Sequence, residues 1–148
     1  MLKVNNRYKC KAKRKDNKEW VEGLFSIRDF AGREYYAIER REKRLLSRIS
    51  CDSQWTMQPY EVIPETVGQC TGLKDKNGKW IFEGDVVNAL LDFGMPIKSI
   101  CVFKDGSFGL LAKQHGVEHF HAFTSICNVK YEVIGNIYDN PELLEVER

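Results

Sequence analysis

The chain reads as a series of short segments in which apolar and polar residues alternate. In residues 7–13, the apolar side chains fall on one face and four cations on the other, as a half-buried β-strand requires. Asn77-Gly78 and Asp105-Gly106 separate such segments, and both residue pairs are typical of tight hairpin turns. Similar patterns predict further strands at residues 20–27, 34–38, 85–90, 100–103, 108–111 and 131–138.

Several short strands with few helical patterns predict a mostly-β protein, built as a small barrel or a sandwich. Residues 39–49 are ambiguous and fit either a short helix or a charged loop. Near the end of the chain, Asn140 suits a helix cap and Pro141 the first helical position, which predicts a short C-terminal helix.

The 148 residues suffice for one compact domain or two very small ones, and a faint internal repeat favours two. At an offset of 60, Cys10, Asn17, Trp20 and Val21 align with Cys70, Asn77, Trp80 and Ile81, of which the first three are identical pairs. Duplication and chance both explain this repeat. With a boundary near Pro64 to Gln69, we expect a basic N-terminal β subdomain over 1–65 and a C-terminal barrel subdomain over 66–148.

The five cysteines, at positions 10, 51, 70, 101 and 127, are odd in number and form no C-x-x-C pair. Free, buried thiols in a reducing cytoplasm explain them best, with a metal or redox role as the alternative. The N-terminus lacks the apolar core of a secretory signal, and no apolar run approaches the roughly 18 residues of a spanning helix. We therefore expect a cytoplasmic protein without a membrane partner.

The three histidines, His115, His119 and His121, lie close together in the sequence. In a strand, His119 and His121 would share a face, a spacing compatible with metal binding, and Cys127 is a possible further ligand. Zinc sites usually combine two patterned ligand pairs, and the chain contains no second pair. Surface histidines are the favoured interpretation, so we expect no metal and no cofactor.

Candidate catalytic groups do not assemble into a known pattern. Glu83 and Asp85 flank Gly84, which suits a catalytic pair but equally suits a tight turn into a strand. The sequence holds no phosphate-binding loop and no H-E-x-x-H motif. We therefore expect a protein that is not an enzyme.

The charge is distributed unevenly along the chain. Residues 1–48 hold 15 Lys and Arg against 7 Asp and Glu, whereas residues 49–148 hold 8 against 14. Basic strands can neutralise phosphates, and Trp20, Tyr35 and Tyr36 could stack on unpaired bases. The candidate nucleic-acid-binding residues are Lys9, Lys11, Lys13, Arg14, Lys15, Lys18, Arg40, Arg41 and Arg44.

Two other interpretations of this charge remain open. The cations at 40–48 are interleaved with Glu39 and Glu42, as on a solvated face. The basic and acidic halves can also attract each other, within one chain or between the chains of an oligomer.

Several segments resemble the YopX family of phage and prophage proteins. Residues 64–69, 71–78 and 81–87 are similar to its central block, and residues 131–143 to its C-terminal block. The Glu-Trp-Val-Glu-Gly at 19–23 is similar to its N-terminal signature, whereas residues 39–60 and 88–130 depart from the family. The resemblance implies a phage or prophage origin, action in the bacterial cytoplasm and SH3-like β-barrel units. It implies no activity and no catalytic residues.

Together these observations predict a mostly-β protein with one or two small SH3-like β-barrels and a short C-terminal helix. The leading functional hypothesis is a non-enzymatic phage accessory protein that binds an unknown phage or host protein and self-associates as a homo-oligomer. The alternative is a nucleic-acid-binding protein that uses the basic N-terminal half.

Overall fold

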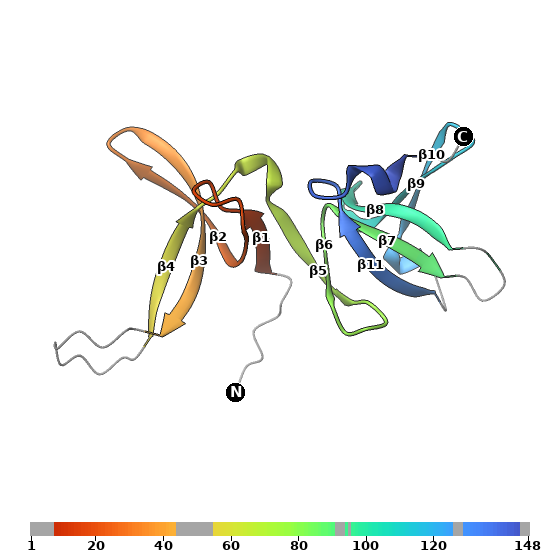
Figure 1. Ribbon diagram of the computed structural model, residues 1–148, viewed down its shortest axis with the longest axis horizontal. Helices are drawn as coiled ribbons and strands as arrows, with labels where there is room; N and C mark the ends of the chain where they lie inside the picture. Colours follow the sequence, from red (N-terminus) through yellow and green to blue (C-terminus); the bar gives the residue numbers. More distant parts are fainter. Residues whose placement is uncertain (1–7, 44–54, 91–93, 95, 126–128, 146–148) are drawn as a thin grey trace. The chain divides into compact units, whose positions relative to one another are not determined.

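The computed structural model describes residues 8–43, 55–90, 94, 96–125 and 129–145 (Figure 1). The chain divides into two compact units, of which the first is Tyr8–Gln69 and the second begins at Cys70. The described residues form antiparallel strands and short 3-10 turns, without an α-helix. The prediction of a mostly-β protein is confirmed, while the SH3-like form of its barrels stays a prediction.

The N-terminal unit is an antiparallel sheet in the order β4-β3-β2-β1-β5. Its elements are β1 (Lys9–Lys13), β2 (Trp20–Phe30), β3 (Arg33–Lys43), β4 (Trp55–Glu61), the 3-10 turn η2 (Pro64–Thr66) and the start of β5 (Gly68–Lys74). The sheet curls because the ends of β1 and β4 meet, as the Lys15 N–H donates to the Glu61 carbonyl and the Ile63 N–H to the Lys13 carbonyl, each at 2.9 Å.

The core of this unit lies on one face of the curled sheet. Ala12, Val21, Ile38 and Val62 are buried there, each from a different part of the sheet. Gly23 lets β2 pass close to β3, since a Cβ at this position would overlap the carbonyl oxygen of Glu39. A residue without a side chain is therefore required where β2 changes its main partner from β1 to β3.

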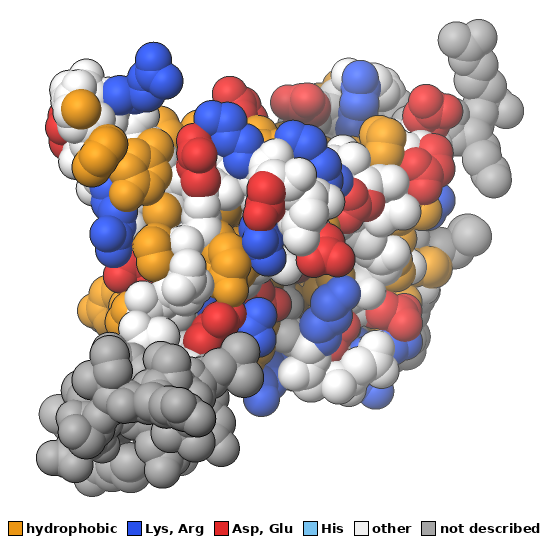
Figure 2. Space-filling view, turned by 60° about the vertical axis from the view of Figure 1, so that its left-hand side comes forward, with side chains coloured by type: hydrophobic (Ala, Val, Ile, Leu, Met, Phe, Trp, Pro, Cys, Tyr) orange, Lys and Arg blue, Asp and Glu red, His pale blue; other side chains and the backbone are white. Residues whose placement is uncertain are grey.

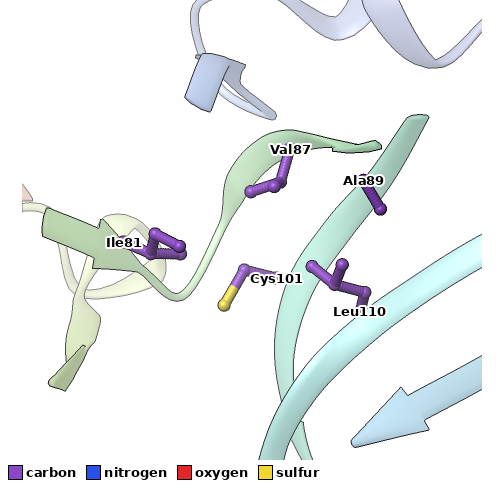
Figure 3. Packing of buried hydrophobic residues seen from close by; sticks show 5 residues of the cluster. All are labelled: Ile81, Val87, Ala89, Cys101 and Leu110. Atoms are coloured by element: carbon purple, nitrogen blue, oxygen red, sulfur yellow. The ribbon is translucent and has the colours of Figure 1, made fainter. Parts of the chain in front are cut away.

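The C-terminal unit contains a five-stranded antiparallel sheet in the order β10-β9-β8-β7-β11. Its strands are β7 (Asp85–Leu90), β8 (Ile97–Lys104), β9 (Ser107–Gln114), β10 (Val117–Ala122) and β11 (Lys130–Asn136), preceded by the end of β5 and β6 (Trp80–Phe82). The 3-10 turns η3 (Phe123–Ser125) and η4 (Pro141–Leu144) complete the described part. Figure 3 shows the core, in which Ile81, Val87, Ala89, Cys101 and Leu110 pack together.

The hairpin turns expected from Asn77-Gly78 and Asp105-Gly106 connect β5 with β6 and β8 with β9. Gly78 and Gly106 have φ values of 81° and 80°, a conformation that glycine adopts without strain. Cys70 and Cys101 are buried and form no disulfide, as predicted, and Cys10 forms none and is half-buried. Cys51 and Cys127 lie outside the described residues.

The prediction of a C-terminal helix is wrong in both the type and the length of the element. Pro141–Leu144 forms a single 3-10 turn, and the backbone is extended again at Glu145. Asn140 stands at the cap position but its side chain makes no cap hydrogen bond. Pro141 therefore marks the start of a turn that ends at Leu144, because the backbone leaves the helical region at Glu145.

Residues 39–43 form neither a helix nor a loop. They continue β3, since each of them pairs with a residue of Trp55–Pro59 in β4. This strand partner is distant in sequence and overrides the local helical spacing. The rest of the ambiguous segment, residues 44–49, lies outside the described residues.

The two hairpins of the faint repeat are alike in one respect. In β1–β2, Lys13 lies opposite Trp20, and in β5–β6, Lys74 lies opposite Trp80. In each hairpin the lysine Nζ approaches the indole ring, at 5.6 and 4.6 Å from the centroid. Whether the repeat reflects duplication stays a prediction.

Candidate interaction surface

The β2–β3 hairpin extends past the strand that pairs with its first half. Strand β1 pairs only with Trp20–Leu24, whereas β3 pairs with β2 from Leu24 to Phe30. Residues 25–36, here called the arm, therefore have β2 paired on one side only, and from Ile27 to Tyr36 they are a two-stranded ribbon, which Figure 1 shows as the orange hairpin. A two-stranded ribbon cannot bury both of its faces by itself.

The arm exposes large apolar side chains on both faces. Phe30 is 76% exposed, Ile27 59% and Phe25 37%. Phe25 and Ile27 lie on the face that carries Tyr36, whose ring stacks on that of Phe25 with 6.1 Å between centroids. Phe30 points to the opposite face, which it shares with the exposed Leu24.

Polar contacts fix the shape of the arm. Arg28 Nη2 donates to Glu39 Oε1 at 2.5 Å, and this hydrogen bond lowers the pKa of Glu39 and raises that of Arg28. At the tip, Asp29 Oδ1 accepts the Gly32 N–H at 3.1 Å. Ala31 and Gly32 have φ values of 55° and 75°, so the turn has both central residues in the left-handed region. The apolar side chains are thus presented on a defined ribbon.

The surface around the arm is mixed in character. Figure 2 brings the side of the molecule with β3 and β4 forward and shows hydrophobic side chains at the surface between charged ones. Met57 of β4 adds a further exposed apolar side chain in this unit. Clustered apolar exposure of this kind is typical of protein interaction sites.

The sequence contained a signal for this surface that alternation alone did not reveal. Residues 24–30 carry apolar side chains at both even and odd positions, through Leu24, Phe25, Ile27 and Phe30. Such a strand is apolar on both faces, which in a small sheet is explained either by burial on both sides or by binding. The structure leaves these side chains exposed.

The first cluster of predicted nucleic-acid-binding residues lies on and just after β1. The register places Lys9, Lys11 and Lys13 on one face, opposite Leu24, Glu22 and Trp20. Lys11 Nζ and Lys13 Nζ lie 5.0 and 5.6 Å from the centroid of the Trp20 ring.

Acidic partners neutralise several of these cations. Lys9 pairs with Glu22 at 3.2 Å, Arg14 with Asp16 at 2.5 Å and Lys15 with Glu61 at 2.7 Å. Lys18 Nζ donates to the Lys15 carbonyl at 3.1 Å. Much of the local charge excess is therefore compensated within the unit.

The second predicted cluster is not a single surface. Arg40 and Arg41 are both exposed, but as consecutive residues of β3 they point to opposite faces. Arg44 and Arg48 lie outside the described residues. A nucleic-acid role of either cluster stays a prediction.

The histidine segment forms the β9–β10 hairpin. His119 and His121 share one face of β10 and are exposed, while His115 occupies the turn at a φ of 49°. Among the residues that the structure describes, no group of three His, Cys, Asp or Glu is placed to hold a metal ion. Cys127, the possible further ligand, lies outside them.

Glu83-Gly84-Asp85 forms the turn from β6 into β7. Gly84 has a φ of 86°, and the buried Asp85 carboxylate accepts the Phe82 N–H at 2.9 Å. Asp85 thus has a structural partner at this turn, as the turn interpretation requires.

The described part of the chain contains no helix of the length and hydropathy that a membrane span needs.

Comparison with known proteins gives matches to solved structures and to a protein family. The crystal structure of protein EF1440 from Enterococcus faecalis is 26% identical, covers 93% of this chain and 97% of its own, and superimposes with a TM-score of 0.47. No curated protein matches the chain significantly. The model of the YopX protein family matches residues 8–145, and the chain therefore belongs to the YopX family.

Proposed function

We propose that this protein is a non-enzymatic protein-interaction module that self-associates, and that the arm is its main contact surface. The observation that carries the proposal is the exposure of Phe25, Ile27 and Phe30 on one short ribbon. Full burial of a large apolar side chain contributes roughly 1.5–3 kcal/mol, and these three, which are 37–76% exposed, leave part of that free energy unrealised. A binding partner that covers them recovers this free energy.

The proposal also includes the cellular location and the biological role of the protein. The protein acts in the bacterial cytoplasm as an accessory protein of a phage or prophage, and it binds a phage or host protein in addition to a copy of itself. Membership of the YopX family supports the setting, and the exposed arm supports the mode of action.

Sedimentation equilibrium tests the proposal directly. The wild-type protein should associate as its concentration rises, and the double variant Ile27→Ser with Phe30→Ser should associate at least tenfold more weakly. Phe103→Ser is the matched control, because Phe103 is 53% exposed but lies in β8 of the other unit. It should associate like the wild type.

Two results would count against the proposal. A wild-type protein that stays monomeric at every concentration would refute self-association. Unchanged association of the double variant would refute the arm as the contact surface. Circular dichroism should show the same strand content in all variants, since the substituted side chains are exposed.

Nucleic-acid binding is the second candidate, favoured by one specific arrangement. Lys11 and Lys13 flank the indole of Trp20 on a single face, which combines cations for phosphates with a ring for bases. The ion pairs of Lys9, Arg14 and Lys15 weigh against it, because a phosphate must compete with a carboxylate already in place.

Fluorescence anisotropy with labelled single-stranded DNA, duplex DNA and RNA separates the two candidates. Binding that weakens steeply with salt, and that is lost when Lys9, Lys11 and Lys13 become Gln, would support the second candidate. Changing Lys98, Lys104 and Lys113 to Gln removes the same charge from the other unit and is the control. Absence of binding at low salt would exclude it, since exposed cations act most strongly there.

A further inference from the structure

One side of the arm is an open sheet edge. In the order β3-β2-β1, strand β3 lies on one side of β2, and β1 covers the other side only as far as Leu24. Beyond that point, no described residue pairs with the second side of residues 25–30. Their backbone N–H and C=O groups are a template for a further strand.

This edge lacks the features that usually protect an edge strand. The edge strand β4 contains Pro59, which has no N–H to donate, and the edge strand β10 carries the exposed Glu118, His119 and His121. The arm edge instead exposes Phe25, Ile27 and Phe30. Of its two charged residues, Arg28 is held by Glu39, and Asp29 accepts the Gly32 N–H at the turn. An unprotected apolar edge is explained if it is covered in the working protein.

We propose that a second copy of this chain covers the open edge of β2 at residues 25–30. The two β2 edges would pair in antiparallel fashion about a twofold axis. This inference rests on the proposed function and specifies its geometry. Charge supports a copy as the occupant, because the arm carries Arg28, Asp29, Arg33 and Glu34, two residues of each sign. Two identical arms therefore meet without net repulsion.

The twofold axis restricts the register of the pair. Residues directly opposite each other must lie on the same face, so one residue lies opposite its own copy. An axis at Arg28 or Asp29 would place like charges directly opposite, which is destabilising. An axis before Ile27 would leave no more than residues 25–27 to pair before the second copy reaches β1 beside Leu24, and an axis at Phe30 would lie at the end of β2, where the turn begins.

The remaining register centres on Ile27. Ile27 then lies opposite Ile27 of the second copy and diagonal to its Phe25, so the most exposed apolar residues of this face cover each other. Ser26 lies opposite Arg28 of the second copy, and Phe25 opposite its Asp29. Each Arg28 keeps its own Glu39, so its charge stays compensated across the pair.

A cysteine placed on the axis tests this register. Opposite Cβ atoms in an antiparallel pair are about 4.5–5.5 Å apart, close enough for a disulfide after a small adjustment. Mild oxidation of Ile27→Cys should give a reducible covalent dimer at least tenfold faster than oxidation of Asp29→Cys. In this register Asp29 lies opposite Phe25 of the second copy, so the two Asp29 residues are offset along the strands by about four residues, roughly 13 Å.

The controls keep this inference distinct from the proposed function. Wild-type protein oxidised in parallel reports any dimer that its native cysteines form. Association in the centrifuge combined with equally fast or equally slow cross-linking of the two variants would overturn the Ile27-centred pairing and leave the proposed function standing. A monomeric wild type without selective cross-linking would overturn both. Selective cross-linking at Ile27 would establish the second copy as the occupant of the edge.

Discussion

The carboxylate of Asp75 accepts a hydrogen bond from the backbone N–H of Val133, 58 residues further along the chain, with 3.0 Å between Oδ2 and N. Its other oxygen, Oδ1, accepts the N–H groups of Asn77 and Lys79, each at 2.9 Å. One buried side chain thus shapes the β5–β6 turn and attaches it to β11. Asp75 is a structural residue in a segment that the sequence marked only as a turn.

Replacing Asp75 with Asn should destabilise the protein by about 2 kcal/mol. The amide keeps one oxygen acceptor but loses the negative charge and turns a donor toward backbone N–H groups. Urea unfolding monitored by tryptophan fluorescence measures the loss. Asp105→Asn is the matched control, because Asp105 is exposed in a hairpin turn and Asn accepts its φ of 50°. Equal stability of the two variants would contradict the role given to Asp75.

The same carboxylate makes stability depend on pH. Burial by itself raises the pKa of Asp75, but the hydrogen bonds from Val133, Lys79 and Asn77 outweigh it and hold the pKa below its ordinary value. Since the unfolded chain takes up the proton at a higher pH, this stabilisation is complete above about pH 4 and is lost as the pH falls through the folded-state pKa. Urea midpoints measured from neutral pH down to about pH 3 should fall less steeply for Asp75→Asn than for the wild type. Parallel curves would contradict this assignment.

Gly23→Ala should be strongly destabilising, by about 2–3 kcal/mol. Its Cβ would overlap the carbonyl oxygen of Glu39 on β3, where backbone atoms cannot move aside without separating the strands. Gly116→Ala is a useful comparison, because it meets nothing within 4 Å but has a φ of 79°. It should cost only about 1 kcal/mol, from backbone strain alone. Thermal unfolding of both variants checks the order, and a Gly23→Ala protein as stable as Gly116→Ala would refute the close approach.

Cys70 and Cys101 should resist modification in the native state. Both side chains are fully buried, whereas Cys10 is half-buried. Short treatment with a maleimide at neutral pH, followed by mass spectrometry of the digested protein, should label Cys10 at least tenfold faster than the two buried thiols. All three should react alike in urea. Rapid native labelling of Cys101 would contradict its position in the core of the C-terminal unit.

Local patterns predicted most of the strands and turns, and particular residues show why. Asn77-Gly78 and Asp105-Gly106 specify tight turns by their own backbone preferences, so these hairpins were predicted from a few neighbouring residues. Residues 39–43 were ambiguous because their charged sequence fits several local structures, and only pairing with β4 makes them a strand. Asn140 and Pro141 carry a valid helix-start signal, but they are followed by a single 3-10 turn.

The candidate surface likewise combines features that local sequence predicted with features that depend on distant contacts. The sequence placed Lys9, Lys11 and Lys13 on one face correctly, because alternation along a strand is a local property. It did not reveal that Lys15 meets Glu61, a residue 46 positions away that curling of the sheet brings near. Nor did it reveal the arm, since the exposure of Ile27 and Phe30 depends on where β1 ends beside β2.

The sequence by itself determined the β class of this protein, its principal turns, its buried thiols at Cys70 and Cys101, and its membership of the YopX family. The β class and the turns follow from backbone preferences and side-chain alternation, which act over a few residues. The thiols were inferred from the number and spacing of the cysteines, and the family from segments that match it along the chain. The tertiary structure decided which cations are neutralised, which carboxylate fixes β11, and which apolar side chains remain in water. Those outcomes depend on contacts between residues far apart in the chain, and such contacts exist only once the strands have paired.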